Sequence, residues 1–324
     1  MLFISAFQFA HAATVNGGHE FVLESDQQQV VGELKTVTTH WEDTLLEIGR
    51  EYGIGYEEMR RANPGVDPWV PGEGTEVTIP TRFVLPEGPR RGVVINLPEY
   101  RLYYYPERAE GEPQRVITYP VSIGQMDWDT PIGRHRVTEM RRNPSWTPPQ
   151  SVRERYAEMG RTLPRVVPPG PDNPMGSRAI RLSLPSYLIH GTNRPEGVGM
   201  RVTHGCIRMF PESVESLYEQ ISVGTEVRII NQPYKVGWRN DVLYLEAHPP
   251  LEEYAEEFAE RGLTVLTQEV VRATRESRAV VDWASAEFIA GQARGVPAAM
   301  ASVDHDAPEV VLDEPVLGSA VAGD

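Results

Sequence analysis

The stretch that decides the fold and the chemistry of this chain reads Ile189-His190-Gly191-Thr192, then Val202-Thr203-His204-Gly205-Cys206-Ile207-Arg208-Met209. We expect His190 to end a β-strand, which is a rigid position from which to aim a base. Cys206 is the only cysteine in the chain, so it has no partner for an internal disulfide. The side chains around this thiol therefore decide whether it is a reactive group or an inert core residue.

The residues on either side of Cys206 include groups that activate a thiol. A thiol is a useful nucleophile only as the thiolate, which requires a nearby base or positive charge. Two imidazoles and one guanidinium are candidates for this role, namely those of His190, His204 and Arg208. Gly191 and Gly205 let the backbone turn sharply or approach a substrate closely. A turn at residues 204–206 would also aim successive N–H groups at one oxygen and form an oxyanion hole.

Two other interpretations of this stretch stay open at this point. His190, His204 and Cys206 are residue types that bind zinc, although His204 and Cys206 would alternate sides in an extended segment and no fourth ligand is evident. Cys206 could also be a buried, inert residue beside two histidines of the core. We expect neither a metal ion nor a cofactor at these residues.

The region around this stretch is predicted to consist almost entirely of β-structure. Apolar runs between turn signals indicate strands over 93–97, 101–105, 116–124, 134–140, 178–182, 187–190 and 226–230. One helix, over about 212–221, precedes the last strand. The proline-rich segment 141–176 is too long for a plain connection, and loops of that size are often lids or binding loops. These features predict a β-sandwich or barrel-like domain with one or two helices.

A small α+β module is predicted ahead of this domain. Its expected order is strand, helix, helix, strand. The strands are predicted over 35–39 and 74–80, the first helix is capped by Asp43 and ended by Gly53, and the second helix spans 56–62. The joint 86–91, rich in Pro, Gly and Arg, separates the module from the β-domain.

The region after the β-domain is predicted to be mainly helical. A hairpin over 236–245 leads into helices over 251–261 and 266–292. Residues 297–324 are rich in Pro, Asp, Glu and small residues, which indicates a disordered acidic tail.

The first residues resemble a secretion signal. An apolar stretch ends in Ala10-His11-Ala12, which predicts a signal peptide over 1–13. The usual basic region before the apolar stretch is missing, and a start codon assigned too far downstream would explain this. A single thiol exported to an oxidising compartment is prone to oxidation, so its retention indicates that the thiol is used.

The composition excludes two classes of protein. The chain has 46 acidic and 31 basic residues, a net charge of −15. Phosphate binding needs a basic face, so we expect no nucleic-acid partner. No apolar run is long enough to span a bilayer. A length of 324 residues indicates two or three domains.

The chain resembles the YkuD-type L,D-transpeptidases. Their signature, His-Gly-Thr followed by Thr-His-Gly-Cys-Ile-Arg, is present at 190–192 and 203–208. Further matches are Thr130-Pro131-Ile132-Gly133, Asn143-Pro144-Ser145-Trp146-Thr147-Pro148 and the proline-rich run 163–176. The order of elements ahead of these motifs, with Asp43-Thr44-Leu45 and Asn63-Pro64-Gly65, resembles a LysM module.

The resemblance implies a fold class and a domain order. A mainly β YkuD-type catalytic domain, sandwich or barrel-like, would occupy 91–231. A LysM-like module over 32–81 would precede it, and an α-helical extension over 232–296 would follow. LysM modules bind the N-acetylglucosamine backbone of peptidoglycan or chitin. Glu42 stands where that family usually has glycine.

The resemblance also implies roles for single residues. Cys206 would attack the carbonyl of meso-diaminopimelate in a tetrapeptide stem and expel the terminal D-alanine, leaving a thioester. His190 would be the general base and acid, oriented by the carbonyl of Gly191. The amides of 204–206, which are those of His204, Gly205 and Cys206, would line the oxyanion hole. Arg208 would hold the motif in place or bind a substrate carboxylate.

The resemblance leaves the acceptor of the acyl group open. It could be another stem's diaminopimelate, which gives a cross-link, or the C-terminal lysine of an outer-membrane lipoprotein. Water would make the protein an L,D-carboxypeptidase or amide hydrolase. The similarity is to the Gram-negative periplasmic branch, which implies a periplasmic location, a thioredoxin-like reductase as partner and carbapenems as inhibitors. The alternative from another class is a non-catalytic wall-binding protein anchored by its LysM module.

Overall fold

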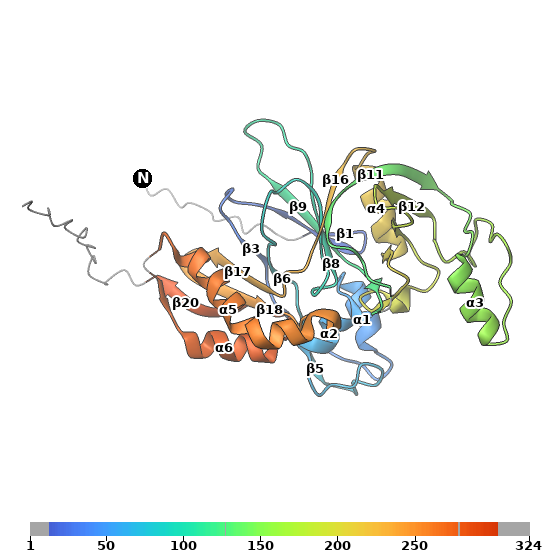
Figure 1. The fold of residues 1–324 in the computed structure, drawn as a ribbon. Helices are drawn as coiled ribbons and strands as arrows, with labels where there is room; N and C mark the ends of the chain where they lie inside the picture. The colour runs from blue at the N-terminus through green and yellow to red at the C-terminus, as the bar shows by residue number, and fades with distance from the viewer. Residues whose placement is uncertain (1–12, 127, 278, 304–324) are drawn as a thin grey trace, which may run out of the picture.

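A curled ten-stranded sheet forms the centre of the molecule (Figure 1). The computed structural model describes residues 13–126, 128–277 and 279–303. From edge to edge the strands are β1 (Ala13–Val15), β2 (Gly18–Val22), β9 (Arg115–Pro120), β8 (Arg101–Tyr105), β7 (Gly92–Asn96), β16 (Glu226–Ile230), β11 (Gly133–Arg142), β12 (Arg178–Leu182), β13 (Leu188–His190) and β15 (Ile207–Arg208). The expected mainly β architecture around the cysteine is therefore confirmed, as one sheet instead of two facing sheets.

One face of this sheet is covered by α4 (Pro211–Gln220). Side chains alternate along the strands, so every second residue of β7 and β8 enters the core on this face: Val93, Ile95, Leu102 and Tyr104. Val214 and Leu217 of α4 pack against them. The helix begins with Pro211 in its first turn, where the missing N–H of proline costs nothing.

The opposite face of the same strands is covered by the small module. Val94, Tyr103 and Tyr105 point to that face and pack with Leu45 and Met59 of the module. Burial on both faces explains why β8 has no exposed residue, since Arg101–Tyr105 are all buried. The module and the sheet therefore share one apolar core.

The module has the predicted order of strand, helix, helix, strand. Its elements are β4 (Lys35–Thr38), α1 (Leu45–Glu51), α2 (Tyr56–Ala62) and β5 (Glu76–Ile79), with β4 and β5 antiparallel. The expected N-cap was wrong by one residue, because the Thr44 side chain accepts the Glu47 N–H at 3.1 Å. Asp43 instead accepts the His40 N–H at 2.6 Å and closes the preceding turn.

Two strand pairs connect the module to its surroundings. β3 (Val30–Gly32) pairs with β6 (Arg82–Val84) on either side of the module in the sequence. β1 and β2 were not predicted, and they join the main sheet through the antiparallel pairing of β2 with β9. The main sheet thus contains strands that precede the module in the sequence, β1 and β2, and strands that follow it.

The proline-rich segment 141–176 is not a structureless loop. It contains α3 (Gln150–Glu158), and an isolated bridge pairs Trp146 with Val167 at the base of the excursion. α3 extends from the body of the molecule in Figure 1. Two shorter elements complete the surroundings of the cysteine motif: the parallel pair β10 (Ile123–Gly124) and β14 (Arg201–Thr203), and the 3-10 turn η1 (Pro195–Gly197).

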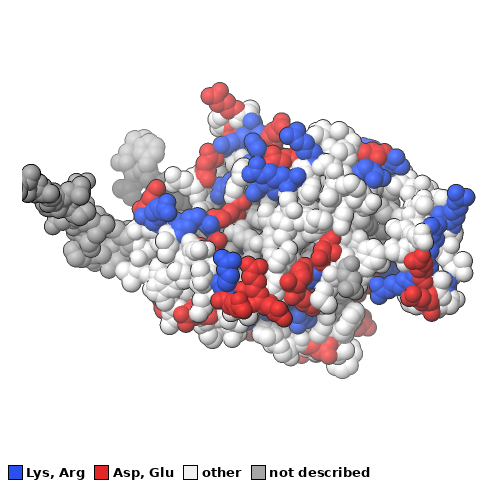
Figure 2. Space-filling view, viewed as in Figure 1, with Lys and Arg blue, Asp and Glu red and all other residues white. Residues whose placement is uncertain are grey.

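The C-terminal part is a mixed α/β unit. A four-stranded sheet has the order β17 (Tyr234–Arg239), β18 (Val242–Ala247), β20 (Ala298–Val303) and β19 (Ala279–Val281). The turn η2 (Glu252–Tyr254) leads into α5 (Ala255–Thr274), and α6 (Trp283–Gln292) follows β19. The hairpin predicted over 236–245 is confirmed, but the expected all-helical remainder was wrong, because β19 interrupts the helix predicted over 266–292 and β20 joins the hairpin. The helices pack on the sheet through Leu266, Val270 and Ala286. Acidic side chains gather over α5 on its exposed side (Figure 2).

Two predictions concern the ends of the chain. The expected tail 297–324 begins with the strand β20, and its residues after 303 lie outside the described residues. The predicted signal peptide 1–13 also lies outside them, except for residue 13, the first of β1. Among the residues described, no helix is both long and apolar enough to cross a bilayer.

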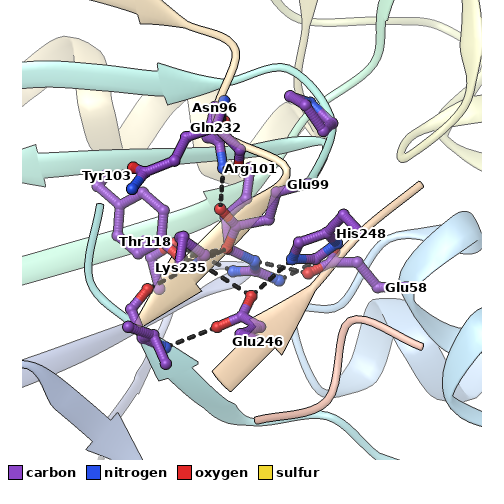
Figure 3. A network of polar contacts seen from close by, with 12 residues as sticks. Glu58, Asn96, Glu99, Arg101, Tyr103, Thr118, Gln232, Lys235, Glu246 and His248 are labelled. Atoms are coloured by element: carbon purple, nitrogen blue, oxygen red, sulfur yellow. Dashed lines mark hydrogen bonds and ion pairs between the residues drawn. The ribbon is translucent and has the colours of Figure 1, made fainter. Parts of the chain in front are cut away.

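A buried network of charged side chains lies where the sheet, the module and the C-terminal unit meet (Figure 3). Lys235 of β17 is fully buried, and its Nζ lies 2.7 Å from Glu99 Oε1 and 2.9 Å from Glu246 Oε1. The same ammonium donates to the Val84 carbonyl at 2.7 Å. His248, whose pKa is lowered by burial to about 3, lies 2.7 Å from Glu246. The Lys235 ammonium is therefore the positive group in direct contact with both carboxylates.

We predict that Lys235→Met lowers the free energy of unfolding by about 3–5 kcal/mol, because two buried carboxylates lose their partner. Lys35→Met is the matched control, since Lys35 is exposed and its loss should cost within about 0.5 kcal/mol. Urea unfolding followed by tryptophan fluorescence measures both values. Equal stability of the two variants would show that the buried ammonium is dispensable.

Candidate active site

The parallel pairing of β13 with β15 brings the two halves of the motif together. Ile189 pairs with Ile207, and His190 pairs with Arg208. Extending this register by one residue places Cys206 beside Leu188. Residues 188 and 190 lie on the same face of β13, so the thiol and the imidazole are on one side of the sheet edge.

Cys206 is half-buried and immediately precedes β15. Its Sγ lies 3.7 Å from the Ser186 carbonyl oxygen. Burial raises the pKa of the Cys206 thiol, while a hydrogen bond from the Leu188 N–H and the charges of Arg208 and Arg181 lower it. The net direction is upward, so the resting sulfur is a protonated thiol that needs a base when it attacks.

His190 ends β13, as predicted, and is 6% exposed. Its Nδ1 lies 2.7 Å from the Gly191 carbonyl oxygen. Since that oxygen can only accept, Nδ1 carries the proton and Nε2 is free to take one. Burial, and after it the charge of Arg208, lowers the pKa of His190 to about 4, against the Gly191 bond, which raises it. The ring is therefore neutral near pH 7 and can act as a base.

Gly205 occupies a backbone position that other residues rarely adopt. Its φ is +90°, and a side-chain carbon would lie 2.7 Å from the Tyr187 ring. Thr130, part of the Thr-Pro-Ile-Gly block, donates its hydroxyl to the Gly205 carbonyl at 2.9 Å. Thr203 donates to the Cys206 carbonyl at 2.6 Å. These two bonds fix the carbonyls of the turn.

His204 and Arg208 differ in their surroundings. The His204 ring packs edge-on against Trp128, with ring centroids 4.9 Å apart, and its pKa is lowered by burial and by the charges of Arg155 and Arg208. Arg208 exchanges backbone hydrogen bonds with Ser122 at 2.8 and 3.0 Å. No described residue accepts a hydrogen bond from its buried Nε. The Arg208 guanidinium thus has donor capacity left for a substrate.

The structure does not support the zinc interpretation of the motif. The described residues hold one group of possible ligand atoms that all lie within 4.8 Å of one another, formed by Glu99, Glu246 and His248. His190, His204 and Cys206 are not part of such a group. In the Glu99 group, the Lys235 ammonium already occupies the position between the carboxylates.

Sequence reasoning missed three groups beside the sulfur. The Leu188 amide, the Tyr187 ring and the Arg181 guanidinium all act on Cys206 or its turn. Tyr187 donates its hydroxyl to the Asp129 carbonyl at 3.0 Å, which ties the loop before β11 to the turn. A backbone amide carries no sequence signal, and Arg181 lies on β12, on a different strand from Cys206 and well before it in sequence.

Comparisons with known proteins give a consistent result. The family model of the L,D-transpeptidase catalytic domain, YkuD, matches residues 90–229. "Probable L,D-transpeptidase YcfS" of Escherichia coli is 45% identical over 231 residues, which are 69% of this chain and 71% of that protein. "Probable L,D-transpeptidase YbiS" of the same species is 37% identical over 270 residues, which are 82% of this chain and 87% of that protein. "Probable L,D-transpeptidase ErfK/SrfK" of Escherichia coli is 38% identical over 261 residues, which are 79% of this chain and 82% of that protein.

We predict that the rate of Cys206 alkylation by iodoacetamide rises with pH, with a midpoint above that of a free cysteine, because burial raises the thiol pKa. Arg208→Gln removes a charge that lowers this pKa, so the midpoint should move further up and the rate at about pH 7.5 should fall. Arg91→Gln, at an exposed arginine paired with Glu226, serves as the control and should leave the profile unchanged. A downward shift in Arg208→Gln would contradict this electrostatic account.

Proposed function

Because the chain belongs to the YkuD family and is an L,D-transpeptidase, we propose that Cys206 attacks the peptidoglycan tetrapeptide stem and forms a thioester with it. The observation that carries the proposal is a half-buried thiol on the same side of the β13–β15 edge as a neutral His190, whose Nδ1 is held by the Gly191 carbonyl. This arrangement leaves His190 Nε2 as the acceptor for the thiol proton.

The proposed first half-reaction exchanges an amide bond for a thioester. The Cys206 sulfur bonds to the carbonyl carbon of meso-diaminopimelate, and its proton moves to His190. The bond to the terminal D-alanine breaks, and the D-alanine nitrogen takes that proton and leaves. The amides of 204–206 would stabilise the oxyanion, an assignment supported by the fixed turn at Gly205.

Arg208 is proposed to bind a carboxylate of the stem. Its guanidinium lies near the thiol, and its Nε has no hydrogen-bond acceptor among the described residues. Burial lowers the pKa of Arg208, yet a guanidinium remains charged at neutral pH. An unsatisfied buried donor is costly, and a substrate carboxylate would satisfy it.

An amine is proposed to resolve the thioester in the second half-reaction. Neutral His190 would remove a proton from the incoming amine, and Cys206 would leave as the thiol. The candidate acceptors of the acyl group are the diaminopimelate of another stem and the C-terminal lysine of an outer-membrane lipoprotein. Incubation of the enzyme with purified peptidoglycan, with and without such a lipoprotein, separates cross-linking, lipoprotein attachment and hydrolysis by product analysis.

The βααβ module is proposed to be a LysM module that binds the glycan. Trp41 and Trp69 are 77% and 57% exposed, and they lie in the two loops that flank the helices. These loops are hydrogen-bonded to each other, since Leu45 N donates to the Pro68 carbonyl at 2.9 Å. Exposed aromatic rings on a fixed frame are suited to stacking on sugar rings. Glu42, beside Trp41, is also exposed and adds a negative charge to this surface.

The periplasm is proposed as the location, since its substrate lies there. A half-buried thiol without a second cysteine can form a sulfenic acid but no internal disulfide. A thioredoxin-like reductase is the proposed partner that restores it. Loss of activity in dilute peroxide, with a one-oxygen mass gain on Cys206 that a thiol reductant reverses, would support this partner.

We predict that Cys206→Ala lowers turnover of tetrapeptide stems by about 10³-fold or more, because no second thiol can replace the nucleophile. Its thermal unfolding should stay close to that of the wild type, since one small side chain is lost. A carbapenem should add its mass to the wild type and not to the variant. Turnover near the wild-type rate in Cys206→Ala would contradict the mechanism, and a wild type that the carbapenem leaves unmodified would favour a non-catalytic wall-binding protein.

We predict that Trp41→Ala and Trp69→Ala each weaken retention on purified sacculi by about three- to tenfold, because each removes a stacking surface. The control is Trp283→Ala, at an exposed tryptophan of α6 outside the module. Co-sedimentation with sacculi measures retention. If all three variants bind like the wild type, the module does not hold the glycan through these rings.

A further inference from the structure

The first turn of α2 makes direct backbone hydrogen bonds to the segment that leads into the cysteine. Tyr56 N donates to the Val198 carbonyl oxygen at 3.2 Å, and Glu57 N donates to the Gly199 carbonyl oxygen at 3.2 Å. The first N–H groups of a helix have no partner within the helix. Here the carbonyls of Val198 and Gly199, in the segment after η1, accept these hydrogen bonds.

The approach of the two backbones is close enough to require glycine on both sides. Gly199 has a φ of +87°, and a side-chain carbon there would lie 2.5 Å from the Gly55 Cα. A side-chain carbon on Gly55 would lie 2.8 Å from the Gly199 Cα. Any larger residue at either position would push the segment away from α2.

The segment continues from this contact to the nucleophile through residues 200–206, which we call the cysteine loop. The Met200 carbonyl accepts the Ile123 N–H at 3.2 Å, and β14 then pairs with β10 in parallel. The Thr203 carbonyl accepts the Gln125 N–H at 3.0 Å. The start of the cysteine loop is fixed by α2 and β10, and its end is fixed by the pairing of β15 with β13.

α2 is itself attached to the main sheet by a buried ion pair, shown in Figure 3. Glu58 accepts the Gly55 N–H at 2.7 Å and contacts Arg101 of β8 at 2.6 and 3.0 Å. Arg101 is fully buried and also donates to the Gly53 carbonyl at 3.1 Å. A helix held in this way at its N-terminus is a rigid support for the carbonyls of Val198 and Gly199.

We propose that the amides of Tyr56 and Glu57 position the cysteine loop, so that the βααβ module is a working part of the active site as well as a proposed glycan-binding unit. Tyr56 and Glu57 are positioning residues, because they act on the Cys206 sulfur through the segment 198–206 and touch no reacting atom. The effect on turnover rests on the proposed function, whereas the effect on the thiol does not. A displacement of a reacting group by about 1 Å can cost about a hundredfold in rate.

Tyr56→Pro tests this role selectively. Proline suits the first helical position, and Gly55, with φ −81° and ψ 166°, has the extended conformation that precedes proline. The substitution therefore keeps α2 and replaces the N–H that faces Val198 with a ring carbon. Tyr56→Ala is the matched control, because it removes the same side chain and keeps the N–H.

Gly199→Ala provides a second test that does not alter α2. Its matched control is Gly111→Ala, since Gly111 has a similar φ of +84° and no atom within 4 Å of the added carbon. Both substitutions add the same backbone strain, but only Gly199→Ala pushes the cysteine loop away from the module.

The readouts are kcat and KM on a soluble tetrapeptide stem and the pH profile of Cys206 alkylation. We expect Tyr56→Pro and Gly199→Ala to lower kcat about ten- to hundredfold relative to their controls, with KM changed less than about twofold. The alkylation midpoint should shift in both variants and stay at the wild-type value in both controls. Alkylation needs no peptidoglycan, so it tests the positioning role even if the wild type turns over no stem. Variants that match their controls in both kcat and alkylation midpoint would overturn the proposal.

Discussion

The parallel pairing of β13 with β15 is the constraint on which the active site depends. Two adjacent strands that run in the same direction need a long connection that returns the chain to its starting end. Here that connection runs from Gly191 to Cys206 and crosses the surface of the module on its way. The position of Cys206, the proposed nucleophile, relative to His190 therefore depends on the contacts that hold this connection. Backbone hydrogen bonds hold it at Val198, Gly199 and Met200.

Buried ion pairs hold the larger parts of the molecule, the module and the C-terminal unit, against the main sheet. Arg101 joins α2 to the sheet through Glu58, and Lys235 joins the C-terminal unit to the sheet through Glu99. Each pair is desolvated, so its partners must meet with good geometry or cost several kcal/mol. Burial raises the pKa of Glu58, and the charge and hydrogen bonds of Arg101 oppose this rise. Charged groups that tolerate few alternative positions restrict how these parts can be arranged.

Much of the fold was predictable because local patterns carry it. Apolar runs gave the strands around His190 and Cys206, and glycine and proline signals separated the two helices of the module. β1 and β2 were missed because short strands at an end of the chain depend on a distant partner, β9. β20 was missed because a run of small residues pairs only where β18 and β19 already lie. The motif predicted which side chains gather at the site, but the Leu188 amide and Arg181 reach the sulfur only through the folded sheet.

The central claim is that Cys206 carries the stem peptide as a thioester after D-alanine has left. The most direct measurement is the intact mass of the wild-type enzyme, quenched in acid while it turns over a disaccharide-tetrapeptide. We expect a mass increase equal to the donor minus one D-alanine, and peptide mapping should place it on the peptide that contains Cys206. Release of D-alanine with no adduct on Cys206, or with an adduct on another residue, would contradict it.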